Sequence, residues 1–368
     1  MRLDFSCMAL AILVMCSPGT FAQLRVNQIQ VIGSHNSYHA GLDPGVAAWL
    51  QKRNPKSAAS LEYRHPPLDV QFSNGIRQVE LDIFADTKGG RYATPAGPRL
   101  VAEAGLPADP PFDPDGLFKK PGFKVIHVQD VDYRSSCQPF TQCLTVILNW
   151  SKAHPGHLPI FVLIENKDGE RSAPYQVIPE PFTTKVFDAL DREIRSVFAP
   201  SQMIVPDDVR GKHATLEEAI LTDGWPALDS ARGKVVFLLD QRRSGPAYLE
   251  GHPSLKGRVI FTNAEPGSPD AAFVEVNDPL KDPAYIPGLI RKGYLVRTRT
   301  DADTVQGRSG DVTQRDAALA SGAQLLSSDY AFEERSTWTG YHVTFPEGTI
   351  ARCNPVLKPP HCDASALR

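Results

Sequence analysis

The chain alternates short runs rich in apolar and β-branched residues with longer segments in which apolar and polar positions are mixed. Eight of the runs have the length and composition of strands: 28–32, 78–84, 124–128, 160–165, 234–240, 259–262, 294–297 and 324–326. Three of the longer segments look helical: 181–198, 215–221 and 315–321. Strands that alternate with helices indicate an α/β protein with a parallel sheet, and eight such strands predict a closed (β/α)8 TIM-type barrel. An open doubly wound sheet is the alternative, but no Gly-x-Gly-x-x-Gly turn follows the first strand.

Two segments fall outside this alternation. Residues 89–121, after the second strand, are rich in Gly and Pro and show no periodicity, so we expect a long insertion loop. Loops of this length are often lids or binding loops, and an ordinary surface excursion is the other interpretation. We expect residues 23–335 to form the barrel domain and residues 336–368 to form a C-terminal extension packed on it.

The first 22 residues have the pattern of a secretory signal peptide. Arg2 gives a positive start, residues 8–15 form an apolar core too short to cross a bilayer, and small residues precede a cleavage position after Ala22. The alternatives are a buried N-terminal helix and a lipoprotein anchor at Cys16. A signal peptide over residues 1–22 predicts a secreted or periplasmic protein.

The number of cysteines is consistent with an exported protein. Two of the six lie in the signal segment, which leaves Cys137, Cys143, Cys353 and Cys362. An even number in an oxidising compartment predicts two disulfides, and the spacing favours the short loops Cys137–Cys143 and Cys353–Cys362. A zinc site is the alternative, but neither pair has Cys-x-x-Cys spacing. The rest of the composition is ordinary, with 42% hydrophobic residues and a formal net charge of −3, so nothing indicates a nucleic-acid partner.

Polar side chains collect near the ends of the first four predicted strands. They are His35 and Asn36, then Glu80 and Asp82, then His127, then Glu165 and Lys167. Each has an ordinary structural explanation when taken alone. In a barrel, however, the carboxyl ends of parallel strands meet at one rim, so these groups should converge there. Charges that point into a barrel mouth cost desolvation energy unless a ligand or metal offsets it.

The residue types in this set suit one kind of chemistry. Asn36, Glu80, Asp82 and Glu165 offer hard oxygen ligands, which favour Ca²⁺ or Mg²⁺ over zinc. Two histidines beside such a metal can serve as acid and base, and Lys167 can bind an anion. Together they favour transfer at a phosphodiester, because a metal lowers the pKa of a hydroxyl and offsets charge in the transition state.

Six stretches resemble a known family. They are GSHNSYH, QVELDIFAD, FKVIHVQD, PIFVLIENKD, LVRTRTDADT and RDAALASGAQLLSSDY. The sequence between residues 26 and 330 resembles the calcium-dependent, phosphatidylinositol-specific phospholipase C-like proteins, which belong to the larger group of PLC-like barrel phosphodiesterases. The resemblance implies a barrel of that type and an enzyme that converts phosphatidylinositol to a cyclic inositol phosphate and diacylglycerol.

The resemblance also implies roles for individual residues. His35 would stabilise the phosphate in the transition state, and His127 would protonate the leaving glycerol oxygen. Glu165 would help to deprotonate the attacking inositol 2-hydroxyl. Calcium, with magnesium as the alternative, would be bound by Asn36, Glu80, Asp82 and Glu165. In some relatives the two histidines are instead described as base and acid, and the sequence does not decide between these schemes.

Substrate contacts are expected from cations on the same rim. Lys167 and Arg297 are candidates for binding the headgroup phosphate, and Arg299 shares the pattern of Arg297. The alternative for the two arginines is a solvated pair bonded to Asp301 and Asp303. The substrate would be a phospholipid headgroup or a soluble phosphodiester, and a lipid substrate implies transient contact with a membrane surface.

Two other functions compete with this one. Glycerophosphodiester phosphodiesterases share the barrel, but they typically show His-Arg-Gly at the first strand and His-Asp at the third. This chain has His35-Asn36-Ser37 and His127-Val128, which favours the phospholipase type. The other competitor is a non-enzymatic lipid-binding or carbohydrate-binding barrel, which loss of a histidine or of Glu80 would favour.

Overall fold

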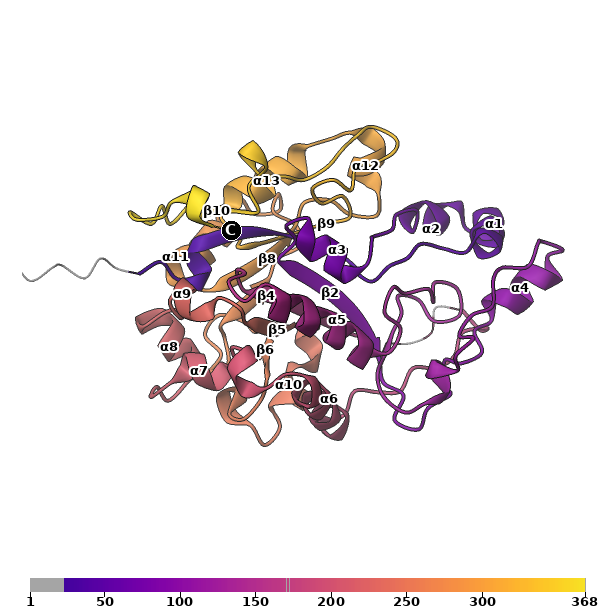
Figure 1. Ribbon diagram of the computed structural model, residues 1–368, viewed down its shortest axis with the longest axis horizontal. Coiled ribbons are helices and arrows are strands. Elements are labelled where there is room, and N and C mark those ends of the chain that lie inside the picture. The colour runs from indigo at the N-terminus through magenta and orange to yellow at the C-terminus, as the bar shows by residue number, and fades with distance from the viewer. Residues whose placement is uncertain (1–22, 170, 172, 368) are drawn as a thin grey trace, which may run out of the picture.

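The computed structural model describes residues 23–169, 171 and 173–367. Eight parallel strands form a nearly closed barrel in the order β6-β5-β4-β2-β1-β9-β8-β7 (Figure 1). The strands are β1 (Ile29–Ser34), β2 (Gln78–Phe84), β4 (Ile160–Asn166), β5 (Val235–Leu239), β6 (Ile260–Thr262), β7 (Phe273–Glu275), β8 (Leu295–Arg299) and β9 (Leu325–Ser328). A single bridge between Asn263 and Phe273 joins the two ends of this order. The predicted TIM-type barrel is therefore confirmed.

Helices cover the outside of the barrel and extend one of its ends. Most follow a strand and pack back on the sheet: α3 (Leu68–Ser73), α5 (Phe140–Ala153), α6 (Thr184–Val197), α7 (Pro206–Arg210), α8 (Leu216–Thr222), α9 (Leu228–Ala231), α10 (Gly245–Leu249), α11 (Tyr285–Lys292), α12 (Val305–Ser309) and α13 (Thr313–Ser321). Three others lie in long loops: α1 (Pro44–Arg53) and α2 (Pro55–Ser60) follow β1, and α4 (Gly97–Glu103) follows β2. Figure 1 shows these loops gathered on the side toward which β2 points.

Most strand residues are buried because both faces of the barrel wall are covered. In β5 every residue of the sequence VVFLL is buried, as expected for a parallel strand with a barrel interior on one side and helices on the other. β2 and β4 are buried along their length except for Glu165, which is partly exposed near the end of β4. The polar residues at these strand ends are therefore exceptions within an apolar wall.

The third predicted strand, 124–128, is wrong as a barrel strand. Only Lys124–Val125 form a strand, β3, and it runs antiparallel to the end of β2. A parallel neighbour would need a crossover along the outside of the barrel. The segment that follows β2 instead stays at the carboxyl end and returns there, so it can only pair antiparallel. The eighth barrel strand is β7, a three-residue strand that the sequence analysis missed.

The two disulfides are confirmed with the predicted pairing, Cys137–Cys143 and Cys353–Cys362. The second lies at the end of β10 (Ala351–Cys353), which pairs antiparallel with β1 and so attaches residues of the predicted C-terminal extension to the barrel. The predicted signal peptide and Cys16 lie outside the described residues. Across residues 23–169, 171 and 173–367, no helix has both the length and the apolar surface to cross a bilayer.

Gly33 sits where β1 meets β2, just before the polar cluster that follows β1. A Cβ atom added at Gly33 would lie 2.0 Å from Gln78 Oε1 and 2.7 Å from Gln78 Cβ, and Gln78 is fully buried. We therefore expect Gly33→Ala to lower the free energy of unfolding by about 1–3 kcal/mol, the usual cost of overpacking. Chemical denaturation measures this change.

Gly156→Ala is the matched control, because a Cβ atom there would have no neighbour within 4 Å. It should leave the free energy of unfolding nearly unchanged. Equal stabilities of the two variants would show that the contact between β1 and β2 is not tight.

Candidate active site

Three carboxylates meet at the carboxyl end of the barrel. One oxygen atom from each of Glu80, Asp82 and Glu165 lies within 4.8 Å of the others. Asp82 and Glu165 are register partners in the ladder between β2 and β4, so their side chains leave the sheet on the same side. The structure thus brings together the acidic residues predicted from the two strands.

Two cations offset the charge of these carboxylates. Lys167 Nζ lies 2.8 Å from Asp82 Oδ2 and 2.8 Å from Glu165 Oε2, and Arg297 Nη2 donates to Glu80 Oε2 over 2.6 Å. Burial raises the pKa of Glu80 to about 7 and raises the pKa of Asp82 above its ordinary value. Burial has the same tendency at Glu165, but the Lys167 ammonium outweighs it and the pKa of Glu165 is lowered. The cluster of three carboxylates therefore favours binding of a positively charged group or ion.

The donor set fits a hard divalent cation. Among the described residues, Asn36 Oδ1 and Asp82 Oδ1 are buried without a hydrogen-bond partner. The amide of Asn36 is oriented by Tyr63, because Asn36 Nδ2 donates to Tyr63 Oη over 2.7 Å and leaves Oδ1 available. Together with Glu80 and Glu165 these oxygens form the ligand type that Ca²⁺ and Mg²⁺ prefer. A bound ion would compete with the Lys167 ammonium for Asp82 and Glu165.

The turn after β1 places Asn36 next to a residue that is bonded to β2, the strand that carries Glu80 and Asp82. Asn36 has a positive φ of 46°, a conformation that asparagine adopts more readily than most residues. Its neighbour Ser37 is tied to β2 twice: Ser37 N donates to Glu80 O over 3.0 Å, and Glu80 N donates to Ser37 Oγ over 2.8 Å. These bonds hold the end of β1 against β2.

His35 forms the first of two histidine–aspartate pairs. Its Nδ1 is 2.7 Å from Asp329 Oδ1, and its Nε2 is 3.0 Å from Arg299 Nη1 and 3.7 Å from Glu80 Oε1. Since a guanidinium can only donate, Nε2 accepts and Nδ1 carries the proton that Asp329 accepts. Burial, with the nearby positive charges of Arg299 and Arg297, lowers the pKa of His35 well below its ordinary value. The imidazole is therefore neutral in this state.

His127 forms the second pair, although it comes from the loop after β3 and not from a barrel strand. Its Nδ1 donates to Asp132 Oδ2 over 2.7 Å, and the same carboxylate accepts from His39 Nε2 over 2.9 and 3.0 Å. Burial lowers the pKa of His127, and the bond with Asp132 opposes that shift. For Asp132 itself burial acts to raise the pKa, but the two imidazoles outweigh it and the net shift is downward.

The two pairs lie close enough to influence each other, since the charge of His127 contributes to the lowered pKa of His35. Neither Asp329 nor Asp132 was assigned a role from the sequence. An aspartate five residues after His127, within one short loop, was the available signal for Asp132. Nothing local signals Asp329, which is 294 positions from His35.

The arginines do not form the solvated pair that the sequence left as an alternative. Arg297 is buried and bonds to Glu80, to Glu275 over 3.1 Å and to Ser327 over 3.2 Å, so the solvated-pair alternative is wrong for it. Arg299 is the guanidinium beside His35, and its Nη2 is 3.4 Å from Asp329 Oδ2. Asp301, the proposed partner in the solvated pair, accepts instead from the backbone N–H of Asp329.

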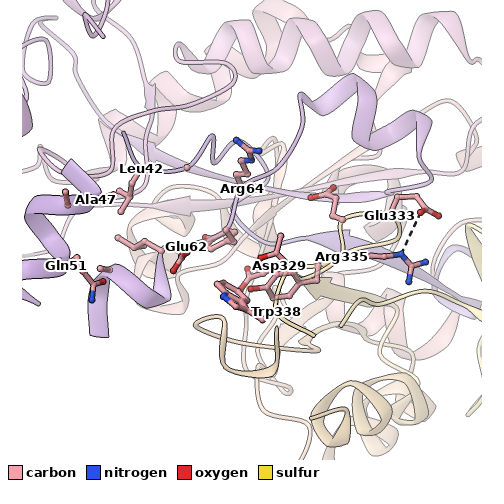
Figure 2. Close-up of a pocket in the computed structure, with 17 residues that line it drawn as sticks. Leu42, Ala47, Gln51, Glu62, Arg64, Asp329, Glu333, Arg335 and Trp338 are labelled. Carbon is pink, nitrogen blue, oxygen red and sulfur yellow. Dashed lines mark ion pairs between the residues drawn. The ribbon is translucent and has the colours of Figure 1, made fainter. Parts of the chain in front are cut away.

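Two cavities lie beside the histidine–aspartate pairs. The larger has a volume of about 680 Å³, and Asp329 and Tyr63 form part of its lining. Figure 2 shows Leu42, Ala47 and Gln51 on one wall of this cavity, and Asp329, Arg335 and Trp338 facing them. The smaller, of about 220 Å³, is lined by residues that include His127, Glu165 and Lys167. One member of each pair thus lines a cavity, Asp329 the larger and His127 the smaller.

Comparison with known proteins shows which family and which solved structures the chain resembles. The family described as phosphoinositide phospholipase C, Ca²⁺-dependent, matches residues 24–355. The calcium-dependent phosphoinositol-specific phospholipase C of a Pseudomonas species is similar in structure, with a TM-score of 0.54 and 15% identity over 92% of this chain and 97% of that chain. The Ca²⁺-dependent phosphatidylinositol-specific enzyme of Streptomyces antibioticus gives 0.52 and 18% over 83% and 95%. At these identities the structural likeness supports the fold alone. No curated protein matches the chain.

Calcium should stabilise the folded protein through the three carboxylates. A ligand that binds only the folded state at a hundred times its Kd adds about 2.7 kcal/mol, so saturating Ca²⁺ should raise the melting temperature by several degrees. Asp82→Asn should abolish most of this rise, as measured by differential scanning fluorimetry with and without chelator.

The exposed Glu103, which pairs with Arg99 on the surface, gives the control Glu103→Gln. It should keep the full calcium effect. An equal rise in the Asp82 variant and in this control would place the ion elsewhere.

Proposed function

The chain belongs to the calcium-dependent phosphoinositide phospholipase C family and is a phosphodiesterase, and we propose that it cleaves phosphatidylinositol by attack of the inositol 2-hydroxyl. The products would be a cyclic inositol phosphate and diacylglycerol. The observation that carries this proposal is the arrangement of two histidine–aspartate pairs beside one acidic cluster at the barrel mouth. An intramolecular attack needs little more than positioned proton donors and acceptors, since geometry supplies much of the rate.

The proton movements follow from the two pairs. As the 2-oxygen bonds to phosphorus, its proton goes to His35 Nε2, and Asp329 stabilises the imidazolium that forms. As the bond from phosphorus to the glycerol oxygen breaks, protonated His127 gives its Nε2 proton to that oxygen and keeps the Nδ1 proton on Asp132. Either base must first give up a bond: His35 Nε2 the one from Arg299, and Glu165, the alternative base, those from Lys167 and Gln241.

The metal ion and the cationic side chains at the barrel mouth have different roles in this proposal. Asn36, Glu80, Asp82 and Glu165 would hold Ca²⁺, with Mg²⁺ as the alternative. Bound there, the ion would lower the pKa of the attacking hydroxyl and offset charge in the transition state. Lys167 and Arg299 would bind the phosphate oxygens. Arg297, expected from the sequence to touch the substrate, would instead orient Glu80, to which it is bonded.

The surroundings support a lipid substrate and an exported protein. Val305 and Trp338, 56% and 38% exposed, lie in segments that follow β8 and β9 and so belong to the same end as the site. We propose that they make transient contact with the lipid surface. Two disulfides are typical of secreted or periplasmic proteins, which fits the signal peptide predicted over 1–22.

A substrate panel tests the proposed reaction. With Ca²⁺ the protein should convert phosphatidylinositol to a cyclic inositol phosphate, visible by ³¹P NMR, and should leave phosphatidylcholine intact. Chelator should abolish turnover and added Ca²⁺ should restore it. Faster cleavage of glycerophosphoinositol, with a non-cyclic product, would favour the glycerophosphodiester phosphodiesterase alternative. Turnover that persists in chelator would remove the metal from the reaction.

His127→Ala should reduce kcat for phosphatidylinositol by about 10²–10⁴-fold, the usual contribution of general acid–base catalysis. Circular dichroism and the melting temperature should show that the variant is folded, because the His127 side chain is partly exposed and its loop is also held by backbone bonds. Near-normal activity in a folded His127→Ala protein would contradict its assignment as the acid.

A further inference from the structure

His39 is a fully buried histidine in the turn after β1, and it lines neither of the two cavities described above. We infer that His39 is a positioning residue for the reaction, which holds the Asp132 carboxylate in the orientation that fixes the His127 imidazole. This inference rests on the proposed function, because it takes His127 as the group that protonates the leaving oxygen. It adds a third member to the pair of His127 and Asp132.

The need for such a residue comes from the way His127 is carried. β3 ends at Val125 and contacts β2 through only two register pairs. From there the chain makes a tight turn, in which the backbone N–H groups of His127 and Val128 donate to Asp132 O over 3.2 and 3.0 Å. A catalytic side chain on a short loop is less precisely placed than one on a strand. Its ring direction must therefore be fixed by side-chain bonds.

Asp132 alone would fix that direction poorly. His127 uses only Oδ2, and a carboxylate bonded at one oxygen can still rotate about its own axis. His39 Nε2 bonds to both oxygens, at 3.0 and 2.9 Å, and removes that freedom. Both side chains, His39 and Asp132, are 0% exposed, so water does not compete for these bonds.

His39 is itself held by the part of the chain that carries the metal ligand Asn36. Its backbone N–H donates to Asn36 O over 2.8 Å, and its carbonyl accepts from His65 N over 2.9 Å. Its ring packs on Tyr63 with centroids 4.5 Å apart, and Tyr63 also accepts the bond from the Asn36 amide. The same turn thus places the oxygen ligand and, through His39 and Asp132, the proton donor.

The chemistry of the leaving group separates this role from a structural one. In the proposed step the Nε2 proton of His127 is transferred to the glycerol oxygen, which is a poor leaving group as an anion. If Asp132 turns away, only this transfer suffers, because the base, the metal ligands and the phosphate cations are untouched. p-Nitrophenolate is a good leaving group and needs no proton when it departs. Cleavage of a substrate that releases it should therefore not slow when Asp132 turns away.

The experiment compares variants on two inositol phosphodiesters, phosphatidylinositol and inositol p-nitrophenyl phosphate. His39→Phe keeps the ring and removes the donor. It should lower kcat for phosphatidylinositol by about 10–100-fold, leave KM unchanged, and alter kcat for the activated ester by less than about threefold. His39→Gln, whose amide N–H can replace Nε2–H, should recover most of the activity. His154→Phe, a histidine before β4 and outside the site, is the control and should behave as wild type.

Several results would overturn the inference. Equal losses on both substrates would mean that His39 supports the fold and not the proton donor. Zinc found in the purified protein and lost from His39→Phe would mean that His39, Asp132 and His127 bind a metal. If His39→Phe does not fold, Asp132→Asn must show the same dependence on the leaving group, and its absence overturns the inference as well.

His127→Ala on the same two substrates distinguishes this inference from the proposed function. A leaving-group effect in His127→Ala but not in His39→Phe would refute the role of His39 and keep His127 as the acid. No leaving-group effect in His127→Ala would refute the acid assignment itself, and the role of His39 with it.

Discussion

A buried carboxylate shared by two imidazoles joins the separate parts of this mouth. Asp132 accepts from His127 and from His39, and these histidines come from different loops at the carboxyl end of the barrel. Burying a lone carboxylate costs several kcal/mol, and the bonds from the two imidazoles offset that cost for Asp132. These bonds fix the loop after β3 against the turn after β1. This contact therefore helps to set how His127 lies relative to the turn that carries Asn36.

The other charged side chains at the barrel mouth are also paired with groups of opposite charge. Glu80, Asp82 and Glu165 would repel one another in an apolar wall, and each is bonded to Arg297 or Lys167. These ion pairs contribute little net stability, since desolvation offsets much of the attraction. Their value is geometric, because they keep the carboxylate oxygens directed toward a common point.

Much of the fold and part of the site could be predicted from the sequence, and the division has a physical cause. The alternation of side chains along a strand is local, so Glu80 and Asp82 could be assigned to one face, and Glu165 to the same rim. Pairing direction is not local. The apolar run at 124–128 looks like its neighbours, yet the chain returns on the same side of the barrel and β3 becomes antiparallel. The strand β7 has only three residues, too few for a pattern.

Side-chain contacts across the barrel could not be predicted from the sequence either. His35 meets Asp329, and Arg297 meets Glu80 across 217 positions, so neither contact leaves a local pattern. The resemblance named the histidines and the oxygen ligands because these lie in compact motifs. It could not name His39 or Asp132 as partners, since their bond depends on how two loops fold over the rim.

The ammonium of Lys167 gives the metal site an internal competitor. It already lies 2.8 Å from Asp82 and from Glu165, so an arriving ion gains only the difference between its own attraction and that of the lysine. The affinity for calcium would then be weaker than the number of oxygen ligands suggests. If an ion displaced it, the Lys167 ammonium would become available to an anion, and binding of an anion to Lys167 would in turn free the carboxylates for the ion. Occupancy of the site would thus be tied to the presence of lipid headgroups, with no moving domain involved.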